Sequence, residues 1–411
     1  MKYSYLHLDR KPDPDREVLL TYKITPPIGA SLEETAEKVA AESSVGTWTP
    51  TETLSPKIFQ DLAAYIYEID RDEKLARIAY PLGLFEPGSL PQMVSGVMGN
   101  VFSMKELEAL RVVEMSLPAE YINSFPGPSL GSAGVRDILG IKSRPIIGSI
   151  MKPKIGLNSR ENAELAYQVW MGGVDLVKDD ENLTDLPVNP FRSRVTETMR
   201  MLKIAQKKTG QTKVYAFNVT APFEQMLERA KIVAEAEGRC IMADIVSVGW
   251  SGLQGLREAF PDMIIHGHRA GHSAFTRVEY HGMTMMILAM MARLAGVDQL
   301  HTGTVVGKME GEADNVIKIN QFLSADWGNL KPVLPVASGG LHPGLVADLF
   351  KILGKDLIIN FGGGIHGHPD GSHEGAKAAR AAVEAASEGE DLFRAAQRCP
   401  ALARALNHWS N

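Results

Sequence analysis

The stretch GGVDLVKDDEN, residues 172–182, joins a short apolar run to one lysine and three consecutive acids. An extended chain points every second side chain to the same side, which places Lys178 and Asp180 on one face. Glu181 follows where the chain leaves the strand and can turn back toward the same point. We therefore interpret the stretch as a strand whose carboxyl end carries a charged cluster.

The same pattern returns along the chain. Eight short apolar runs, rich in β-branched residues, are each followed by a helix-length amphipathic segment such as 191–206 or 342–354. The runs are RPIIGSIMKPK (144–154), GVDLVKDDE (173–181), KVYAFNVTAP (213–222), RCIMADIVSVGW (239–250), MIIHGHRAG (263–271), QLHTGTVVGK (299–308), KPVLPVASGG (331–340) and DLIINFGGG (356–364). This order predicts an α/β fold with a C-terminal (β/α)8 TIM barrel, and a doubly wound open sheet is the alternative.

Ahead of the barrel, the signals follow a βαββαβ order. Strands are expected at 17–25, 62–70, 74–82 and 109–118, and helices after the capping box of Ser31 and Glu34 and near 90–100. The order predicts a smaller N-terminal α+β domain of the ferredoxin-like type. Because a Gly-, Pro- and Ser-rich segment follows at 125–134, the expected domains are 1–124 and 125–411, the second ending in a helical tail.

Composition narrows the classes of function. The chain has 411 residues, is 45% hydrophobic and carries a formal net charge of −6. No lysine- or arginine-rich run is present, which argues against a nucleic-acid or membrane partner and favours a small polar substrate. Residues 283–296 are too few to span a bilayer and include Arg293, so a buried helix is expected. The N-terminus lacks the apolar region of a signal peptide and the two cysteines lack disulfide spacing, which predicts a cytoplasmic protein.

Polar residues or glycines stand near the ends of the apolar runs. In a (β/α)8 barrel the active site is built from the carboxyl ends of the strands, so we expect these residues to converge on one face. They are Lys152, Lys154, Lys178, Asn218, His268, Arg269, His272, His301, Lys308, Ser338, Gly339, Gly340, Gly362, Gly363 and Gly364.

The acids of the first stretch have the chemistry of a magnesium site. Asp180 and Glu181 offer carboxylate oxygens, the ligands that Mg²⁺ prefers. Lys178 has two interpretations. It pairs with the acids as a cation, or it reacts as a neutral amine with carbon dioxide and becomes an anionic oxygen ligand. The pattern alone does not choose between them.

Four further motifs have a functional interpretation, and three of them also have a structural one. Lys152 and Lys154 share a face, which suits proton transfer but also fits a solvated lysine pair. HGHRAGH, residues 266–272, suits proton shuttling and phosphate binding, although such histidines are often structural. The glycines of 337–340 and 361–367 predict backbone phosphate sites. GTVVGKMEG, residues 303–311, is either a lid that carries Lys308 or a surface loop.

Together these motifs resemble the large subunit of ribulose-1,5-bisphosphate carboxylase/oxygenase (RuBisCO). The resemblance covers almost the whole chain and is carried by AESSVGTW (41–48), GNVF (99–102), KPKIGL (152–157), GGVDLVKDDEN (172–182), HGHRAGHSAFTR (266–277), HTGTVVGKMEG (301–311), LPVASGG (334–340) and FGGGIHGHPDG (361–371). The short stretch between KMEG and LPVASGG and the form of the last motif are most like the archaeal-type (form III) branch.

The resemblance implies a lyase that adds carbon dioxide or oxygen to the enediolate of ribulose 1,5-bisphosphate, the carboxylation giving two 3-phosphoglycerate. It implies that Lys178 is carbamylated by an activator carbon dioxide and that the carbamate, Asp180 and Glu181 hold Mg²⁺. The implied catalytic residues are Lys152, Lys154, Lys178, His268 and Lys308. The implied substrate-binding residues are Glu42, Thr47, Trp48, Asn100, Arg269, His301, Ser338, Gly339, Gly340, Gly362 and Gly363.

The resemblance also implies a homodimer or an assembly of dimers. Glu42, Thr47, Trp48 and Asn100 would complete the site of the neighbouring subunit, and no small subunit is expected. The implied role is nucleoside or AMP salvage. Two alternatives remain at this point: a RuBisCO-like enolase or isomerase that acts on another phosphosugar, for example in methionine salvage, and a non-catalytic phosphosugar-binding barrel.

Overall fold

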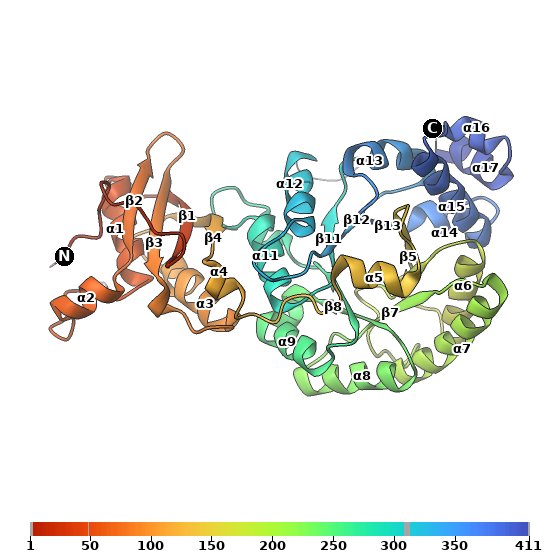
Figure 1. Cartoon of the computed structure of the whole chain (residues 1–411), viewed down its shortest axis with the longest axis horizontal. Coiled ribbons are helices and arrows are strands. Elements are labelled where there is room, and N and C mark those ends of the chain that lie inside the picture. Colours follow the sequence, from red (N-terminus) through yellow and green to blue (C-terminus); the bar gives the residue numbers. More distant parts are fainter. Residues whose placement is uncertain (1–2, 48, 308–312, 410–411) are drawn as a thin grey trace. The chain divides into compact units, whose positions relative to one another are not determined.

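The computed structural model of the chain describes residues 3–47, 49–307 and 313–409. The chain forms two compact units (Figure 1). The first contains 1–126, 271–295 and 327–330, and the second contains 127–270, 296–326 and 331–411. The division expected after residue 124 stays a prediction, and each unit is described by itself below.

The second unit is built around a closed barrel of parallel strands. In the order of pairing these are β5 (Ile146–Ile150), β6 (Leu176–Lys178), β7 (Val214–Asn218), β8 (Cys240–Asp244), β9 (Ile264–His268), β11 (Gln299–Gly303), β12 (Leu334–Ser338) and β13 (Ile358–Phe361). β13 pairs back with β5 through Ile358 and Ile146, which closes the ring. The predicted (β/α)8 barrel is confirmed, and the open sheet is excluded.

Apolar side chains fill the amino-terminal half of the barrel. The first residues of seven strands belong to one buried cluster: Ile146, Leu176, Val214, Cys240, Ile264, Leu334 and Ile358. Val135 and Leu139 of α5 (Gly131–Leu139) join the same cluster, so α5 covers this end. Because the apolar residues occupy one end, the polar side chains of the strands are left at the carboxyl ends, where barrel active sites lie.

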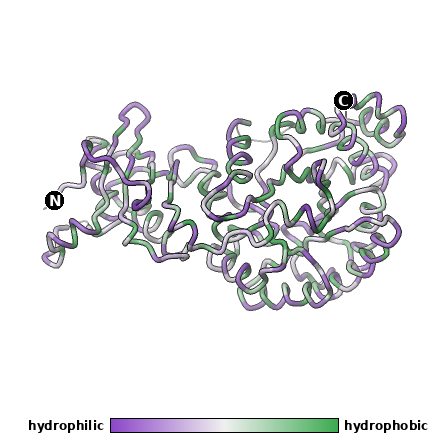
Figure 2. The backbone as a smooth tube through the Cα atoms, in the orientation of Figure 1, coloured by the Kyte–Doolittle hydropathy of each residue, from purple (hydrophilic) through white to green (hydrophobic). Residues whose placement is uncertain are grey.

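Helices surround the strands of this unit (Figure 1). They are α6 (Ser159–Met171), α7 (Phe191–Thr209), α8 (Phe223–Glu235), α9 (Ile245–Ala259), α12 (Ala313–Ser324), α13 (Val346–Leu353) and α14 (Gly363–His366), followed by the tail helices α15 (Ser372–Glu388), α16 (Leu392–Ala396) and α17 (Pro400–Trp409). Hydrophilic and hydrophobic residues alternate along them (Figure 2), as expected of helices with one buried face. The predicted helical tail is present.

In the fourth apolar run, the strand is shorter than expected. Residues 239–250 were expected to form one strand, but β8 stops at Asp244 and α9 begins at Ile245. The run IVSVGW is apolar without strand alternation, and its helix bends at Gly249, where φ is +69°. Periodicity over so few residues does not separate a buried helix from a buried strand. The shorter strand leaves Asp244 at a carboxyl end.

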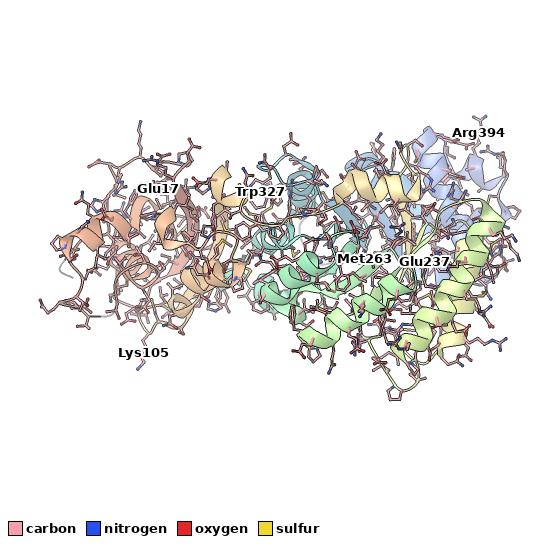
Figure 3. All side chains as sticks on the ribbon, turned by 60° about the horizontal axis from the view of Figure 1, so that its bottom comes forward. Glu17, Lys105, Glu237, Met263, Trp327 and Arg394 are labelled. Atoms are coloured by element: carbon pink, nitrogen blue, oxygen red, sulfur yellow. The ribbon has the colours of Figure 1, made fainter. Side chains whose placement is uncertain are left out.

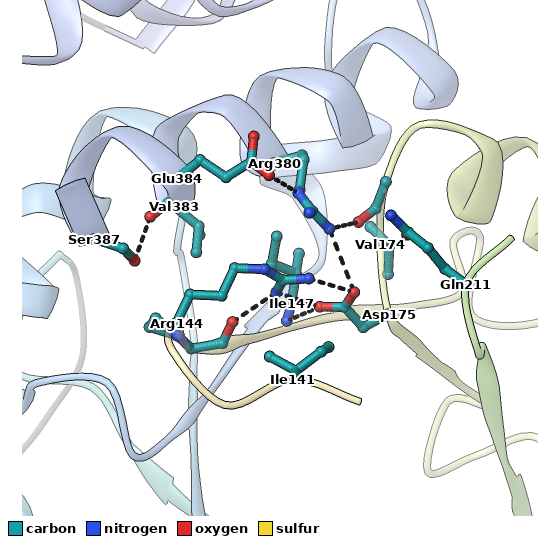
Figure 4. A network of polar contacts seen from close by, with 12 residues as sticks. Ile141, Arg144, Ile147, Val174, Asp175, Gln211, Arg380, Val383, Glu384 and Ser387 are labelled. Atoms are coloured by element: carbon teal, nitrogen blue, oxygen red, sulfur yellow. Dashed lines mark hydrogen bonds and ion pairs between the residues drawn. The ribbon is translucent and has the colours of Figure 1, made fainter. Parts of the chain in front are cut away.

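An ion-pair network ties the tail helix α15 to the amino-terminal side of the barrel (Figure 4). Asp175 is 2% exposed and accepts two hydrogen bonds from Arg144, at 2.6 and 2.8 Å, and one from the backbone N–H of Ile147 at 2.8 Å. Arg380 of α15 lies 3.6 Å from the same carboxylate and donates to Glu384. The bidentate pair with Arg144 is the geometry that offsets the cost of burying a carboxylate.

The first unit contains a five-stranded sheet with the order β10-β4-β1-β3-β2. Its elements are β1 (Glu17–Thr25), α1 (Leu32–Glu42), α2 (Pro56–Leu62), β2 (Tyr65–Asp70), β3 (Leu75–Pro81), the 3₁₀ turn η1 (Leu82–Leu84), α3 (Leu90–Met98), the 3₁₀ turn η2 (Asn100–Ser103), β4 (Ala109–Ser116), α4 (Ala119–Ile122), α10 (Ser273–Thr276), β10 (Gly282–Met283) and α11 (Met285–Ala295). The antiparallel order β4-β1-β3-β2 is that of the predicted ferredoxin-like domain, which is confirmed. The capping box of Ser31 and Glu34 is also present.

Several short elements of this unit were not expected, including α2 and β10. α2 begins at Pro56, after the N-cap Ser55, and β10 adds a short parallel strand beside β4. Glu17 of β1, labelled in Figure 3, is buried. It accepts a 2.7 Å hydrogen bond from the hydroxyl of Tyr65 in β2.

The methionine-rich segment 283–296 forms the buried helix that was predicted. Most side chains of α11 are buried, including that of Arg293, and the helix packs against β4 and α3 within the first unit. In the part of the chain that the structure describes, none of the helices combines the length and the hydrophobicity that crossing a membrane requires.

Candidate active site

Lys178 ends β6 and lies inside the mouth of the barrel. Its side chain is fully buried, and its ammonium nitrogen Nζ donates a 2.8 Å hydrogen bond to the backbone carbonyl of Asp179. Burial lowers the pKa of Lys178 to about 8, although Glu181, Asp180 and Asp244 oppose the shift. At pH 7 about a tenth of this amine is therefore neutral, far more than for a lysine at its usual pKa, and only a neutral amine is a nucleophile.

The two acids that follow Lys178 are each close to a lysine. Asp180 is fully buried and receives a 2.9 Å hydrogen bond from Nζ of Lys152, and Lys154 lies 3.7 Å from Glu181. Burial alone would raise the pKa of Asp180, but hydrogen bonds from Lys152 and Asn182 bring the pKa below its usual value. The structure thus brings together Lys152, Lys154, Asp180 and Glu181, as expected from the sequence.

The donor set fits Mg²⁺ only if Lys178 contributes. No group of three or more His, Cys, Asp or Glu side chains placed to hold a metal occurs among residues 3–47, 49–307 and 313–409. Asp180 and Glu181 supply two carboxylates, and Mg²⁺ favours oxygen ligands together with retained waters. A carbamate on Lys178 would supply a third anionic oxygen group beside them. The residues present therefore fit the metal in the carbamylated form of the chain.

A buried aspartate positions His268 beside this cluster. The Nδ1 atom of His268 lies 3.0 Å from Asp244 Oδ1, and its Nε2 atom lies 3.8 Å from Glu181 Oε2. Burial and the positive charge of Lys178 lower the pKa of His268, which keeps the ring neutral, while burial raises the pKa of Asp244 to about 6. With Nδ1 facing a carboxylate, Nε2 is the ring nitrogen left for proton exchange in the mouth.

A chain of hydrogen bonds crosses the mouth from β9 to β12. Gln299 Oε1 lies 2.7 Å from Nδ1 of His266, Nε2 of His266 lies 2.8 Å from Nε2 of His301, and Nδ1 of His301 lies 2.8 Å from the hydroxyl of Ser338. Burial lowers the pKa of His266 to about 3 and that of His301 well below its usual value, so both rings are neutral. Each ring then donates through one nitrogen and accepts through the other, which fixes its orientation.

Arg269 places an uncompensated cation next to His301. Burial lowers the pKa of Arg269 to about 10, and no acidic neighbour in the described part of the chain raises it. Gly303 permits the approach, because a Cβ atom there would lie 2.7 Å from Nη2 of Arg269. The backbone at Gly303 also has a φ of +101°, which side-chain-bearing residues rarely adopt. A desolvated guanidinium without a carboxylate is well suited to bind an anion.

Several of these groups border one cavity of about 390 Å³. Its lining combines charged groups, glycines and the end of the tail helix: Ile150, Lys152, Glu181, His268, His301, Ser338, Gly339, Gly340, Leu341, His342, Asn360, Gly362, Gly363, Gly364 and Trp409. Gly339 and Gly340 have φ values of +109° and +64°, so they form a turn that other residues would strain. Most of the predicted barrel residues therefore lie around a single cavity.

The remaining predicted residues lie elsewhere. Trp48 and Lys308 are outside the described residues. Glu42, Thr47 and Asn100 belong to the first unit, where α1, which ends at Glu42, contacts the 3₁₀ turn η2, which begins at Asn100. His272 also belongs to the first unit, and its ring lies 2.9 Å from the hydroxyl of Thr276.

Two family models match the chain in sequence. Residues 4–121 match the ribulose bisphosphate carboxylase large chain, N-terminal domain, and residues 131–409 match its catalytic domain. The chain belongs to the ribulose bisphosphate carboxylase large-chain family. The RuBisCO resemblance stated from the sequence motifs is thereby confirmed.

Similar RuBisCO proteins come from archaea. A ribulose bisphosphate carboxylase of Pyrococcus abyssi is 48% identical over 98% of this chain and 96% of its own length. The one from Methanocaldococcus jannaschii is 44% identical over 99% of this chain and 100% of its own length. These relatives agree with the archaeal-type resemblance.

Two solved RuBisCO structures have nearly the same fold. An octameric Rubisco from Pyrococcus horikoshii has a TM-score of 0.95 and 46% identity, covering 98% of this chain and 96% of its own. A dimeric Rubisco from Hyperthermus butylicus has a TM-score of 0.93 and 43% identity, covering 98% of each chain.

Several polar residues of this RuBisCO barrel were not singled out from the sequence. Asp244 was hidden inside a run interpreted as one long strand. His266 is the middle residue of β9 and Gln299 is the first residue of β11, so neither stands at a carboxyl end, and only the barrel geometry shows that they face each other. Asn360 lines the cavity, and its buried side-chain oxygen has no hydrogen-bond partner in the structure described. The sequence signal that could have identified Asn360 is its position, since it is a polar residue two positions before the glycines that follow the last apolar run.

Proposed function

We propose that the chain is a magnesium-dependent ribulose-bisphosphate carboxylase/oxygenase. It adds carbon dioxide, or oxygen, to the enediolate of ribulose 1,5-bisphosphate, and carboxylation followed by hydration and cleavage gives two molecules of 3-phosphoglycerate. The observation that carries the proposal is the buried, readily neutral amine of Lys178 next to Asp180 and Glu181, at the mouth of a barrel from this family.

The first event is activation of Lys178. The lone pair of its neutral amine forms a bond to the carbon of an activator carbon dioxide, and one proton leaves the nitrogen. The product is a carbamate whose negative charge suits the position of Mg²⁺ beside Asp180 and Glu181. When bound, Mg²⁺ would act as a Lewis acid toward two substrate oxygens and stabilise the enediolate charge.

The lysines and the histidine at the mouth have the proton-transfer roles. The carbamate of Lys178 helps to remove the substrate proton whose loss gives the enediolate. Lys152 and His268 handle later proton transfers, with His268 exchanging protons through the Nε2 atom that faces Glu181. Lys154 supports the charge of the enediolate, and Lys308 stabilises the newly formed carboxylate.

Two groups of residues would bind the two phosphates. The first contains Arg269, His301 and Ser338, where the half-buried guanidinium and the hydrogen-bonded hydroxyl and imidazole support anion binding. The second contains the glycine turns of Gly340, Gly362 and Gly363, together with Thr47 and Trp48 of the neighbouring subunit. Backbone N–H groups of such turns bind phosphate without a charged side chain.

The active form that we propose is a homodimer or an assembly of dimers without a small subunit. Glu42, Thr47, Trp48 and Asn100 of one subunit would complete the site of its neighbour. The dimeric and octameric solved relatives support this proposal. We further propose a cytoplasmic enzyme that consumes ribulose bisphosphate from nucleoside or AMP salvage.

Fixation of labelled carbon tests the proposed reaction. Purified protein is pre-incubated with bicarbonate and Mg²⁺ and then given ribulose 1,5-bisphosphate and carbon-14 bicarbonate. We expect acid-stable label in 3-phosphoglycerate that depends on the pre-incubation. Absence of label from a folded, oligomeric sample would overturn the carboxylase proposal. Enolisation of another phosphosugar by that sample would point instead to a RuBisCO-like enolase.

A further inference from the structure

Asp179 is the middle acid of the Lys178–Glu181 cluster, and neither metal binding nor catalysis has been assigned to it. Strand alternation turns its side chain away from Lys178 and Asp180. It enters the layer between the strands and the helices, where Tyr215 of β7 packs against Trp170 of α6. There the carboxylate of Asp179 is fully buried.

A buried carboxylate costs several kcal/mol unless it is paired and hydrogen-bonded. Asp179 accepts a 2.6 Å hydrogen bond from the hydroxyl of Tyr215, a 2.9 Å bond from the backbone N–H of Asn218 and a 3.2 Å bond from Nε of Arg194. The Tyr215 hydroxyl in turn accepts from Asn162 at 3.0 Å. All of these partners are buried, so the carboxylate is held by an almost complete set of donors.

Arg194 extends this arrangement to the loop that follows the cluster. Its guanidinium is fully buried and also donates to the backbone carbonyls of Asn189, at 2.8 Å, and Thr184, at 2.5 Å. Asn218 reinforces the same region, since its side-chain amide donates to the carbonyls of Asp180 and Glu181 at 3.3 and 3.0 Å. Asp179 is therefore fixed together with the backbone on its C-terminal side.

The backbone of Asp179 makes the contact that matters for activation. Its N–H donates to the carbonyl of Ala216 at 3.1 Å, and its own carbonyl accepts the 2.8 Å hydrogen bond from Nζ of Lys178. Holding the Asp179 side chain thus holds the acceptor that directs the Lys178 amine.

We propose that Asp179 is a positioning residue for activation. With Arg194 and Tyr215 as its partners, it fixes the carbonyl that orients the Lys178 nitrogen and the backbone that carries Asp180 and Glu181. This inference rests on the proposed carbamylation of Lys178. When the amine becomes a carbamate, it gains a bond to carbon, loses one proton and keeps one N–H. That N–H continues to donate to the Asp179 carbonyl, which turns the carbamate oxygens toward Asp180 and Glu181.

The variant Asp179→Asn tests the proposal. It replaces one carboxylate oxygen with an NH₂ group, which is a donor and cannot accept the hydrogen bonds that Tyr215, Arg194 and Asn218 donate. Carbamate formation is followed by carbon-13 NMR of the whole protein with labelled carbon dioxide and Mg²⁺, a readout that is independent of turnover. We expect the carbon dioxide concentration for half-activation to rise at least about tenfold, the scale seen when a partner of a metal ligand is removed. The turnover of the fully activated fraction should change far less.

Asp298→Asn is the matched control. Asp298 is also fully buried, pairs with Arg257 at 2.5 Å and accepts backbone N–H bonds from Gly131 and Ile265 at 2.8 and 2.9 Å. It precedes β11 and therefore lies at the opposite, amino-terminal end of the barrel. We expect Asp298→Asn to lower the unfolding temperature and to leave half-activation unchanged. Equal half-activation in wild type and Asp179→Asn would overturn the positioning role.

Tyr215→Phe keeps the test decisive if Asp179→Asn fails to fold. It removes the 2.6 Å hydrogen bond to Asp179 and the 3.0 Å bond from Asn162, and it preserves the ring contacts with Trp170 and Phe217. We expect the same shift in half-activation at a smaller size, and an unshifted value in Tyr215→Phe would contradict the proposal. A wild-type protein that shows no carbamate signal would instead reject the proposed activation itself, so the two failures are distinguishable.

Discussion

Nζ of Lys152 lies 2.9 Å from a carboxylate oxygen of Asp180 that solvent does not reach. Asp180 is also a proposed ligand of Mg²⁺, so the lysine and the metal would compete for the same carboxylate. Lys152 is itself a proposed proton carrier, and entry of the metal would release its ammonium group from Asp180 toward the cavity that it lines. The ion pair therefore links the binding of the metal to the freeing of a catalytic group.

Replacing Lys152 with glutamine should separate metal binding from turnover. We expect Lys152→Gln to bind Mg²⁺ about tenfold more tightly in the presence of bicarbonate, because one nearby positive charge is removed, while carboxylation falls at least about a hundredfold. Isothermal titration with Mg²⁺ and carbon-14 fixation provide the two measurements. Lys154→Gln is the control, since Lys154 is 57% exposed and 3.7 Å from Glu181, and its effect on Mg²⁺ affinity should be smaller. Weaker Mg²⁺ binding by Lys152→Gln would contradict the competition.

Before carbamylation, Lys178 is expected to lower the free energy of unfolding of the protein. Its pKa of about 8 means that burial disfavours the charged form more than the neighbouring acids favour it. We therefore expect Lys178→Met to raise the free energy of unfolding by about 1–3 kcal/mol while abolishing carbon fixation. Denaturation of wild type and variant is measured in buffer without bicarbonate and Mg²⁺, so that Lys178 of the wild-type protein is not carbamylated. A less stable variant would show that attraction to Asp180, Glu181 and Asp244 outweighs the cost of burial.

Lys213 should make stability depend on pH at the amino-terminal side of the barrel. It is 2% exposed, its ammonium donates to the carbonyl of Val174 at 2.8 Å, and burial lowers its pKa from 10.5 to about 8. Between these two values the unfolded chain holds a proton that the folded chain has lost. Stability therefore rises with pH through this window, by at most about 1.4 kcal/mol per pH unit, and the cost of the buried charge is fully present below it.

Urea denaturation of wild type and Lys213→Met checks this pH dependence. Methionine does not titrate, so the stability of wild type minus that of the variant should increase from pH 8 to pH 10.5. A difference that stays constant across the window would show that the folded Lys213 titrates like an unfolded lysine.

The sequence predicted the architecture because its signals are local and repeated. Seven of the eight barrel strands begin with an apolar residue, and polar residues or glycines stand at or just after the strand ends. The capping box of Ser31 and Glu34 marks the start of α1. The fourth strand was misjudged for the same reason. The run through Trp250 contains only apolar and small residues after Asp244, and such a run fits a buried helix as well as a strand.

The site was predictable where its residues follow strands directly, as with Lys178, Asp180 and Ser338. The hydrogen-bond chain through His266 and Gln299 was not predictable, because it joins side chains from two strands that lie 33 positions apart in the sequence. The role of Asp179 was equally hidden. Its sequence places it among the proposed metal-binding acids. Strand alternation turns its side chain away from Lys178 and Asp180, but only the structure shows that Arg194 and Tyr215 hold it there.

Complementation between two inactive variants tests the proposed sharing of sites between subunits. Lys178→Met removes the group that activates the barrel of its own chain, and Glu42→Gln removes a carboxylate that we expect to act in the barrel of the partner. Each variant alone should be inactive. In a dimer of one Lys178→Met chain and one Glu42→Gln chain, one shared site would carry both defects and the other would carry none.

Co-expression of the two variants with different tags, followed by purification through both tags, isolates the mixed dimers. Because one of the two sites in each mixed dimer is intact, we expect about half of the wild-type carbon fixation per dimer. If each site were formed by one chain alone, every site would carry one of the two defects and the mixed dimers would fix no carbon. Recovery of activity thus requires that Glu42 and Lys178 of the same site come from different chains, which is the reason that a monomer should be inactive.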